Sequence, residues 1–151
     1  MDRQQRRGSG AQTLQHYWRN RAEATPEKWS LELGVWHEGT FVGIQGVSTT
    51  DFAFTRTGGT GSWLGLPFQG RGTGTLMRQA ICALCFDHLG FEVTSGAFTD
   101  NPQSWAVSMK VGYVPNGLFR FMRRDALAVD RQLLLTPEAF VRSELAGADS
   151  A

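Results

Sequence analysis

A glycine-rich segment between a short apolar run and a long amphipathic one restricts the folds open to this chain more than any other feature. Ser62–Leu66 predicts a strand, Gln69–Gly74 has glycine at every second position, and Thr75–Leu89 has the apolar spacing of a helix. Glycine lets the backbone approach a ligand closely, and a helix N-terminus carries a partial positive charge. The segment therefore predicts a cradle for an anion such as a pyrophosphate, which Arg71 and Arg78 could extend.

Two well-known phosphate-binding loops do not match this segment. A Walker A loop ends in Gly-Lys followed by Ser or Thr, and no such ending occurs here. The dinucleotide fingerprint G-x-G-x-x-G does not fit the spacing of Gly70, Gly72 and Gly74. A glycine-rich turn before a helix does not by itself identify the ligand.

The rest of the chain predicts strands and helices in a mixed order. Trp29–Trp36 has the period of two that is typical of a strand. The expected elements, in order, are helix Thr13–Glu23, strands Trp29–Trp36 and Phe41–Val47, a connection or strand edge at Asp51–Thr57, strand Ser62–Leu66, helix Thr75–Leu89, strand Glu92–Phe98, helix Gln103–Val111, a turn-rich link at Tyr113–Gly117, strands Leu118–Arg123 and Ala126–Leu135, and a short helix opened by Thr136-Pro137. This order predicts an α/β domain with a mixed sheet.

Length and composition predict one domain in a reducing compartment. The chain has 151 residues, and we expect a disordered tail over 1–12, a single domain over 13–145 and a frayed end over 146–151. We find neither a secretion signal nor an apolar run of about 18 residues, so the protein is expected to be cytoplasmic with no membrane segment. Cys82 and Cys85 lie inside a helical pattern, which indicates core thiols rather than a disulfide framework.

Charge and histidine spacing exclude further classes. The formal net charge is only +1, which argues against nucleic-acid binding by the whole domain. The three histidines His16, His37 and His88 are scattered, and no spacing typical of a metal site occurs.

The glycine-rich loop and a second motif together resemble a known family. Gln69–Gly74 fits the Q/R-x-x-G-x-G/A motif of the GNAT acyltransferases, and Trp63-Leu64-Gly65 before it is similar to the RimJ/RimL branch, especially its actinobacterial members. A second block resembles the N-x-x-S…V…K-x-G-F/Y signature of that branch. Its residues are Asn101, Ser104, Val107, Lys110, Gly112 and Tyr113. The resemblance runs from about Trp29 to Phe140 and implies the GNAT fold, without its usual first strand and helix.

The resemblance also implies a cofactor site. Acetyl-CoA or another acyl-CoA, with no metal, would lie in a V-shaped split between the strands Ser62–Leu66 and Glu92–Phe98. Backbone groups of the first strand would pair with the pantetheine arm, and the loop would hold the pyrophosphate. The implied cofactor-binding residues are Leu64, Leu66, Gln69, Gly70, Arg71, Gly72, Thr73, Gly74, Thr75, Asn101 and Ser104.

The implied reaction is direct attack of an amine on the thioester. A backbone N–H near Leu64 is the expected donor to the developing oxyanion, and Ser104 matches the family's candidate for protonating the departing thiolate. Two local alternatives stay open. Asn101 also fits a helix N-cap, and Ser104 fits equally well as a residue in the first turn of a helix without a catalytic role.

The chain departs from the family pattern at two points. The N-terminal segment is short, which would leave a sheet edge exposed and favours a homodimer. Relatives often carry Glu or Asp where Gly59 stands, so a general base for the incoming ammonium is missing there. Asp51, His37 and Asp100 are candidate replacements, and a chain of waters is equally credible.

The sequence therefore favours an N-acyltransferase that moves an acetyl group, or another short acyl such as succinyl, to an amine. The acceptor would be a small molecule, a protein N-terminus or a lysine. A succinyl donor would need a nearby arginine, for which Arg120, Arg123 and Arg124 are candidates. The alternatives are an acyl-CoA-binding regulatory module with little catalysis, and an interaction or nucleic-acid-binding domain on the same scaffold.

Overall fold

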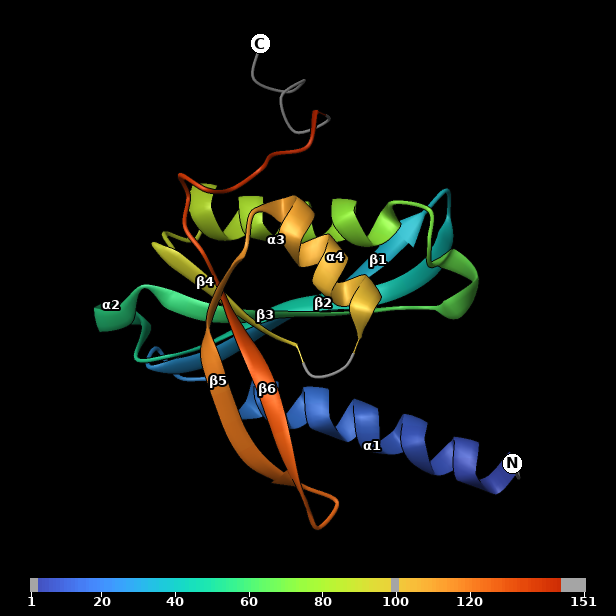
Figure 1. Ribbon diagram of the computed structural model, residues 1–151. Coiled ribbons are helices and arrows are strands. Elements are labelled where there is room, and N and C mark those ends of the chain that lie inside the picture. The colour runs from blue at the N-terminus through green and yellow to red at the C-terminus, as the bar shows by residue number, and fades with distance from the viewer. Residues whose placement is uncertain (1–2, 99–100, 145–151) are drawn as a thin grey trace.

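The computed structural model describes residues 3–98 and 101–144, which form one six-stranded mixed sheet with helices on both faces (Figure 1). The elements are α1 (Arg3–Ala22), β1 (Lys28–His37), β2 (Thr40–Thr50), α2 (Phe52–Thr55), β3 (Thr57–Leu64), the 3₁₀ turn η1 (Leu66–Phe68), α3 (Thr73–Asp87), β4 (Val93–Phe98), α4 (Pro102–Val111), β5 (Val114–Arg123) and β6 (Ala126–Leu135). The strand order is β1-β2-β3-β4-β6-β5. The predicted α/β class and mixed sheet are confirmed.

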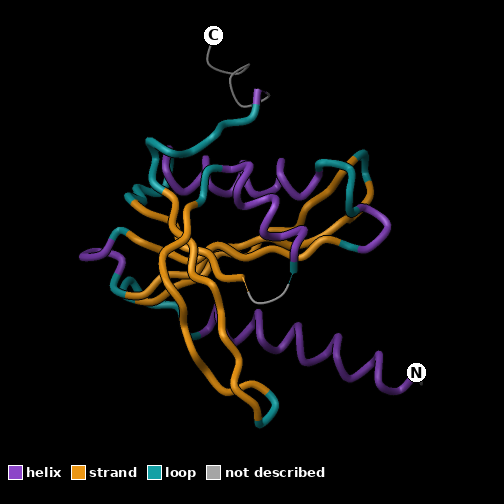
Figure 2. Tube along the Cα trace, viewed as in Figure 1, coloured by secondary structure: helices purple, strands orange, loops and turns teal. Residues whose placement is uncertain are grey.

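The helices divide between the two faces of the sheet. α3 and α4 lie together over one face, whereas α1 and the protruding end of the β5–β6 hairpin lie on the other side (Figures 1 and 2). The core lies between the sheet and α3–α4. Its buried apolar residues are Val47, Ile81, Cys82, Cys85, Phe91, Val111, Tyr113, Leu133, Leu135 and Phe140. Both cysteines are therefore free core thiols, as the sequence predicts.

β3 and β4 separate soon after they begin to pair. They are parallel and pair only from Thr57 to Gly59 on β3 and from Val93 to Ser95 on β4, although both strands continue beyond that point. The strands β2 and β6 keep β3 and β4 in the sheet on their outer sides. The expected V-shaped split between these two strands is therefore present.

β3 begins earlier and ends earlier than the sequence predicts. The expected strand was Ser62–Leu66, because Gly58, Gly59 and Gly61 are typical of a loop. Gly58 is required inside the strand, since a Cβ there would collide with the Phe91 ring. Leu66 belongs to the 3₁₀ turn instead, because Pro67 has no N–H to pair with a strand and the Phe68 N–H donates to the Gly65 carbonyl at 2.9 Å.

Three other expectations are corrected. α1 begins at Arg3 rather than at Thr13 and takes in Gly8 and Gly10, with no proline before Pro26. β5 begins at Val114 and takes in most of the expected link. From Thr136 to residue 143 the described chain forms no helix: it makes one turn, and the Val141 N–H then donates to the Val111 carbonyl at 3.0 Å, which ties the chain to the end of α4. Residues 146–151 lie outside the described residues.

Candidate active site

The glycine-rich loop ends at the N-terminus of α3 in the conformation that its glycines favour. Gly70 and Gly72 have φ angles of 74° and 81°, in the left-handed region, and Gly72 is the N-cap of the helix. A Cβ at either position would meet no atom within 4 Å, so both glycines border open space. Backbone N–H groups and the positive end of the helix dipole therefore border space that an anion can enter.

A cavity of about 340 Å³ extends from this loop along β3 to α4. It is lined by Ser62, Leu64, Gln69, Gly70, Gly72, Gly74, Thr75, Arg78, Asn101, Gln103, Ser104, Ala106, Val107 and Lys110. Most of the sequence-predicted cofactor residues thus share one cavity. Leu66, Arg71 and Thr73 do not line it. The Leu66 side chain is exposed, and its carbonyl accepts from the Gln69 N–H.

The backbone of β3 presents unpaired groups to the split. The Gly65 N–H donates to the Val42 carbonyl, which makes these two residues a hydrogen-bonded pair of the β2–β3 ladder. Because such pairs alternate along an antiparallel ladder, the N–H and C=O of Leu64 and Ser62 point away from β2, toward β4. Beyond Gly59, β4 no longer pairs with them. The Leu64 carbonyl accepts a hydrogen bond from Gln69 Nε2 at 2.9 Å.

Asn101 caps α4 and also lines the cavity. Its Oδ1 accepts from the N–H groups of Gln103 at 3.1 Å and Ser104 at 3.2 Å. The alternative of a helix N-cap is therefore correct for Asn101, and it positions the start of α4 at the edge of the cavity. Ser104 is half-buried in the first turn and lines the same cavity.

Arg78 lies beneath the cavity rather than at its mouth. Its side chain is only 7% exposed, with Nη1 donating to Ser108 Oγ at 3.1 Å and Nη2 to Ser62 Oγ at 3.3 Å. Its Nε has no partner, and among the described residues no carboxylate forms an ion pair with it. The site thus has a buried positive charge, the Arg78 guanidinium. Its hydrogen bond to Ser62 links this charge to β3. Sequence reasoning did not single out Ser62, because a lone serine on a strand carries no pattern.

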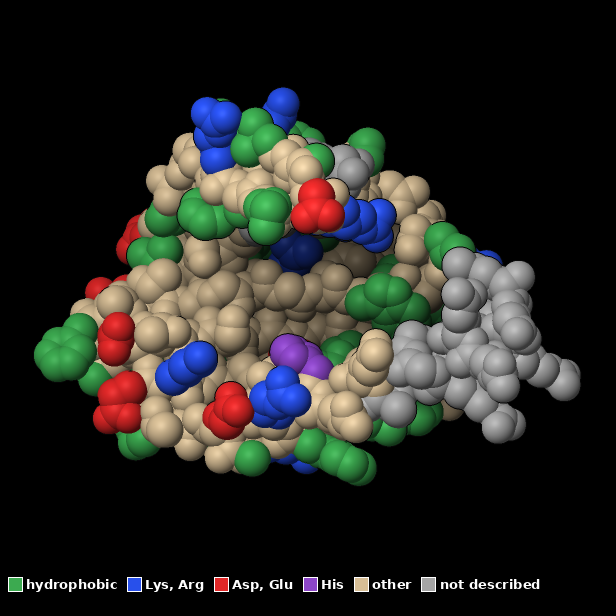
Figure 3. Space-filling view, turned by 90° about the horizontal axis from the view of Figure 1, so that it is seen from below, with side chains coloured by type: hydrophobic (Ala, Val, Ile, Leu, Met, Phe, Trp, Pro, Cys, Tyr) green, Lys and Arg blue, Asp and Glu red, His purple; other side chains and the backbone are tan. Residues whose placement is uncertain are grey.

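The opposite face of the sheet is hollowed where β3 and β4 part. Two adjoining cavities of about 450 Å³ and 310 Å³ share the residues Glu32, Ser48, Gly59 and Ser95. His16 and Asn20 of α1 border the larger cavity, together with Glu23 just after the helix. Figure 3 shows this face with its deep hollow and a histidine side chain at the border. The cavity beside the glycine-rich loop and this hollow border neighbouring stretches of β3, the first at Ser62 and Leu64 and the second at Gly59, Thr60 and Gly61.

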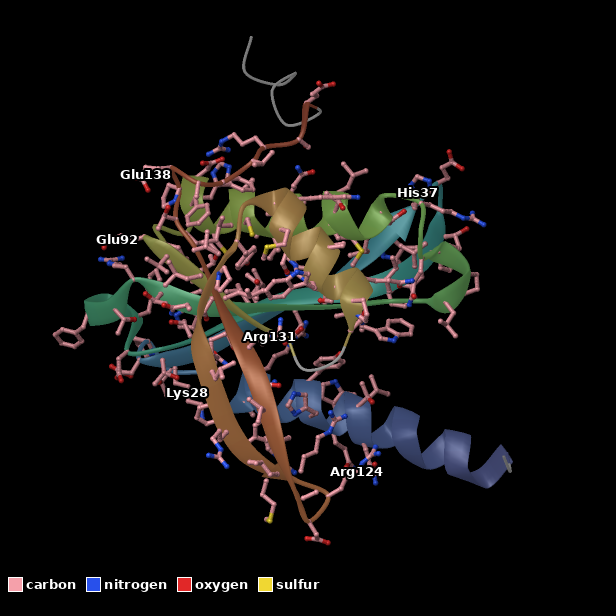
Figure 4. The ribbon with its side chains drawn as sticks, in the orientation of Figure 1. Lys28, His37, Glu92, Arg124, Arg131 and Glu138 are labelled. Atoms are coloured by element: carbon pink, nitrogen blue, oxygen red, sulfur yellow. The ribbon has the colours of Figure 1, made fainter. Side chains whose placement is uncertain are left out.

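Two of the three residues predicted to replace a base at Gly59 do not lie in this hollow. Asp51 and His37 are absent from its lining, and His37 is at the far end of β1 (Figure 4). Asp100 lies outside the described residues. Glu32 is the carboxylate that both cavities share. Glu32 lies opposite Gly46 on a half-buried strand. This position becomes apparent only once the strands are paired, so the sequence alone did not single out Glu32.

The arginines considered for an acidic acyl group lie along the β5–β6 hairpin. Arg120, Arg123 and Arg124 are exposed, and Arg124 is at the hairpin tip (Figure 4). None of them lines the cavity beside the glycine-rich loop. No group of three His, Cys, Asp or Glu side chains suited to a metal occurs among the described residues. The helices described here include none that is both long and apolar enough to cross a membrane.

A cavity at a glycine-rich helix N-terminus, beside a split between parallel strands, fits an enzyme that binds an acyl-CoA. The model of the acetyltransferase (GNAT) domain matches residues 2–114. The chain therefore belongs to the GNAT acetyltransferase family, whose members are acyl-CoA-dependent N-acetyltransferases that transfer the acyl group to an amine. The assignment to this enzyme class is confirmed at the level of the family.

Solved structures of this family share the fold. RimJ of Mycobacterium smegmatis, in a complex with CoA-disulfide, is 22% identical with a TM-score of 0.74, and the match covers 83% of this chain and 61% of RimJ. A spermidine N-acetyltransferase of Vibrio cholerae, in a complex with CoA and spermine, is 11% identical with a TM-score of 0.69, over 83% of this chain and 75% of that chain. At such identities the likeness supports the fold and no particular substrate.

Proposed function

We propose that this protein transfers a short acyl group, acetyl or a close relative such as succinyl, from CoA to a primary amine by direct attack. The observation that carries the proposal is the pair of cavities on opposite faces of the sheet, which border neighbouring stretches of β3 beside the point where β3 and β4 part. A donor held on the α3–α4 face and an acceptor entering from the α1 face would approach each other through the split. The similarity to RimJ supports membership of the RimJ/RimL branch.

The loop and α3 would bind the donor's pyrophosphate. Gly70, Gly72, Gly74 and Thr75 border the cavity at the helix N-terminus, where N–H groups and the helix dipole favour negative charge. The described residues fit a CoA moiety there, because Gly70 and Gly72 keep the space in front of their backbones open. Gln69 would act indirectly, by holding the Leu64 carbonyl.

The strand β3 and the helix α4 would serve the reacting end. The N–H groups of Leu64 and Ser62 face the split and would donate to the pantetheine arm and to the thioester oxygen as negative charge develops there. Ser104 would protonate the departing thiolate, while the Arg78 guanidinium beneath the cavity favours negative charge above it. A second copy of the chain covering the exposed edge of β1 stays a prediction.

A thermal-shift titration with acetyl-CoA, succinyl-CoA and CoA tests the donor site. A ligand at about 100 times its dissociation constant stabilises the fold by about 2.7 kcal/mol, which raises the melting temperature by several degrees. The rank order of the shifts identifies the acyl group. A cooperatively folded sample that responds to none of the three would contradict the proposal. Binding without transfer to any amine would favour the regulatory module instead.

A further inference from the structure

We propose that the hollow on the α1 face is the acceptor site for a primary alkylammonium group, and that Glu32 binds this group and removes its proton. The inference rests on the proposed function and assigns the base that Gly59 cannot supply. It places the carboxylate on β1, two strands away from the position that the family resemblance indicates.

The pairing of the strands directs Glu32 into the hollow. Glu32 pairs with Gly46 on β2, and Gly46 pairs with Gly61 on β3, so the three residues form one row across the sheet. Directly paired residues point to the same face. A Cβ added to Gly46 would collide with Oε2 of Glu32, so the carboxylate leans over Gly46 toward β3.

Glycines form the row of the sheet that leads from Glu32 to β3. Gly46, Gly59 and Gly61 line the smaller cavity together with Glu32. A Cβ at Gly61 would meet no atom within 4 Å, and one at Gly59 would meet only Ser95 Oγ, at 3.5 Å. Packing of neighbouring side chains therefore does not demand glycine at these two positions. A floor of bare backbone gives an ammonium group room to pass from the carboxylate to the split.

The hollow carries charges of both signs around Glu32. Burial raises the pKa of Glu32, while the nearby positive charge of His16 lowers it. The other charged residues bordering the hollow are Glu23, which follows α1, and Lys28 of β1, and none of the described residues forms an ion pair with Glu32. Figure 3 also shows a Lys or Arg side chain deep in the hollow. An unpaired, partly desolvated carboxylate binds an ammonium ion strongly, and a raised pKa makes it a better proton acceptor.

The proposed step balances without another reactant. One ammonium proton passes to a Glu32 carboxylate oxygen, and the nitrogen lone pair attacks the thioester carbonyl carbon. The C–N bond forms, the C–S bond breaks, and the sulfur leaves as a thiolate that takes up a proton. Glu32 then returns its proton to solvent, so that one amide, one CoA thiol and one released proton result.

The test compares two amines of similar size on purified Glu32→Gln and wild-type protein. Propylamine is protonated at neutral pH, whereas 2,2,2-trifluoroethylamine is largely neutral and needs little help from a base. With acetyl-CoA as donor, we expect Glu32→Gln to lower kcat/KM for propylamine at pH 7 by about a hundredfold or more. The loss should shrink as the pH rises toward the pKa of propylamine, and transfer to trifluoroethylamine should change far less.

Two further variants keep the test decisive. Glu92→Gln makes the same substitution at an exposed residue outside the hollow, and we expect wild-type rates from it.

Gly61→Val narrows the floor and leaves the carboxylate in place, so we expect a higher KM for propylamine with acetyl-CoA affinity unchanged. Nα-acetyl-lysine amide in place of propylamine separates a lysine side chain from a small amine as the source of the ammonium group.

The outcomes separate this inference from the proposed function. A wild-type protein that binds no acyl-CoA overturns both. A protein that binds acetyl-CoA but acylates none of these amines overturns the acceptor assignment alone. Three results would each refute the role of Glu32 and its hollow. The first is a Glu32→Gln variant with the pH profile of the wild type, and the second is an equal loss of kcat/KM for propylamine and trifluoroethylamine at every pH. The third is an unchanged KM for propylamine in Gly61→Val.

Discussion

The hydroxyl of Tyr113 lies 2.7 Å from Thr60 Oγ1, and this contact joins the end of α4 to β3 at the point where β3 and β4 part. Thr60 Oγ1 also lies within hydrogen-bond distance, at 3.3 Å, of the Ser95 carbonyl on β4. Tyr113 is 2% exposed, and its hydroxyl also contacts Thr94 Oγ1 and Cys82 Sγ. A buried polar cluster thus replaces the ladder hydrogen bonds that β3 and β4 lose where they separate.

We expect Tyr113→Phe to lower the free energy of unfolding by about 1–2 kcal/mol, because it leaves buried hydroxyl groups with fewer partners. Urea denaturation of the variant and the wild type measures this difference. Tyr17→Phe removes the hydroxyl of a tyrosine on the partly exposed helix α1 and should change stability little. Equal stability of Tyr113→Phe and the wild type would show that the cluster does not hold the split together.

We expect Gly72→Ala to weaken acetyl-CoA binding beyond any effect on folding. Gly39 is a matched control, since its φ angle is 79° against 81° for Gly72 and a Cβ at either residue meets no atom within 4 Å. Each substitution should cost about 1 kcal/mol of backbone strain. Only Gly72→Ala should reduce the thermal shift that acetyl-CoA produces. Equal shifts in the two variants would place the pyrophosphate elsewhere.

We expect the thiols of Cys82 and Cys85 to resist alkylation in the folded protein. Both are fully buried, and burial, with a smaller contribution from Cys82, raises the pKa of Cys85 to about 12. The thiolate fraction at pH 8 is therefore very small. Mass spectrometry after iodoacetamide treatment should show no adduct without denaturant and two in guanidinium chloride. Rapid modification of the native protein would mean that α3 opens readily.

We expect Glu32→Gln to stabilise the folded protein at neutral pH. Because burial raises the folded-state pKa of Glu32 above its unfolded value, the charged carboxylate is less favourable in the folded state. Below the unfolded pKa the carboxyl is neutral in both states, so the variant gains nothing there. The advantage should appear as pH rises through the unfolded and then the folded pKa. Urea denaturation at several pH values measures it, and a gain confined to acid pH would contradict the sign.

Local chemistry made several parts of the site predictable. The positive φ angles of Gly70 and Gly72, the start of a helix just after them and the stop at Gly112 all follow from short-range preferences of the backbone. The capping role of Asn101 was one of two interpretations open from the sequence. The helical spacing around Cys82 and Cys85 was enough to assign both to the core.

Other parts depended on contacts between distant segments. Gly58, Gly59 and Gly61 look like a loop, but pairing with β2 and packing against Phe91 make them a strand. Leu66 continues an apolar run, yet Pro67 turns the chain out of the sheet. After Thr136, anchoring of Val141 to Val111 prevents the expected helix.

The sequence by itself determined the conformation of the glycine-rich loop and the helix that follows it, because both are set by residues adjacent in the chain. Only the tertiary structure decided which residues line the hollow on the opposite face of the sheet. The side of a strand that a residue occupies, and its neighbours there, depend on register between segments far apart in sequence. The register of β1, β2 and β3 brings Glu32 over the row of glycines on β2 and β3, and β3 separates from β4 beside that row.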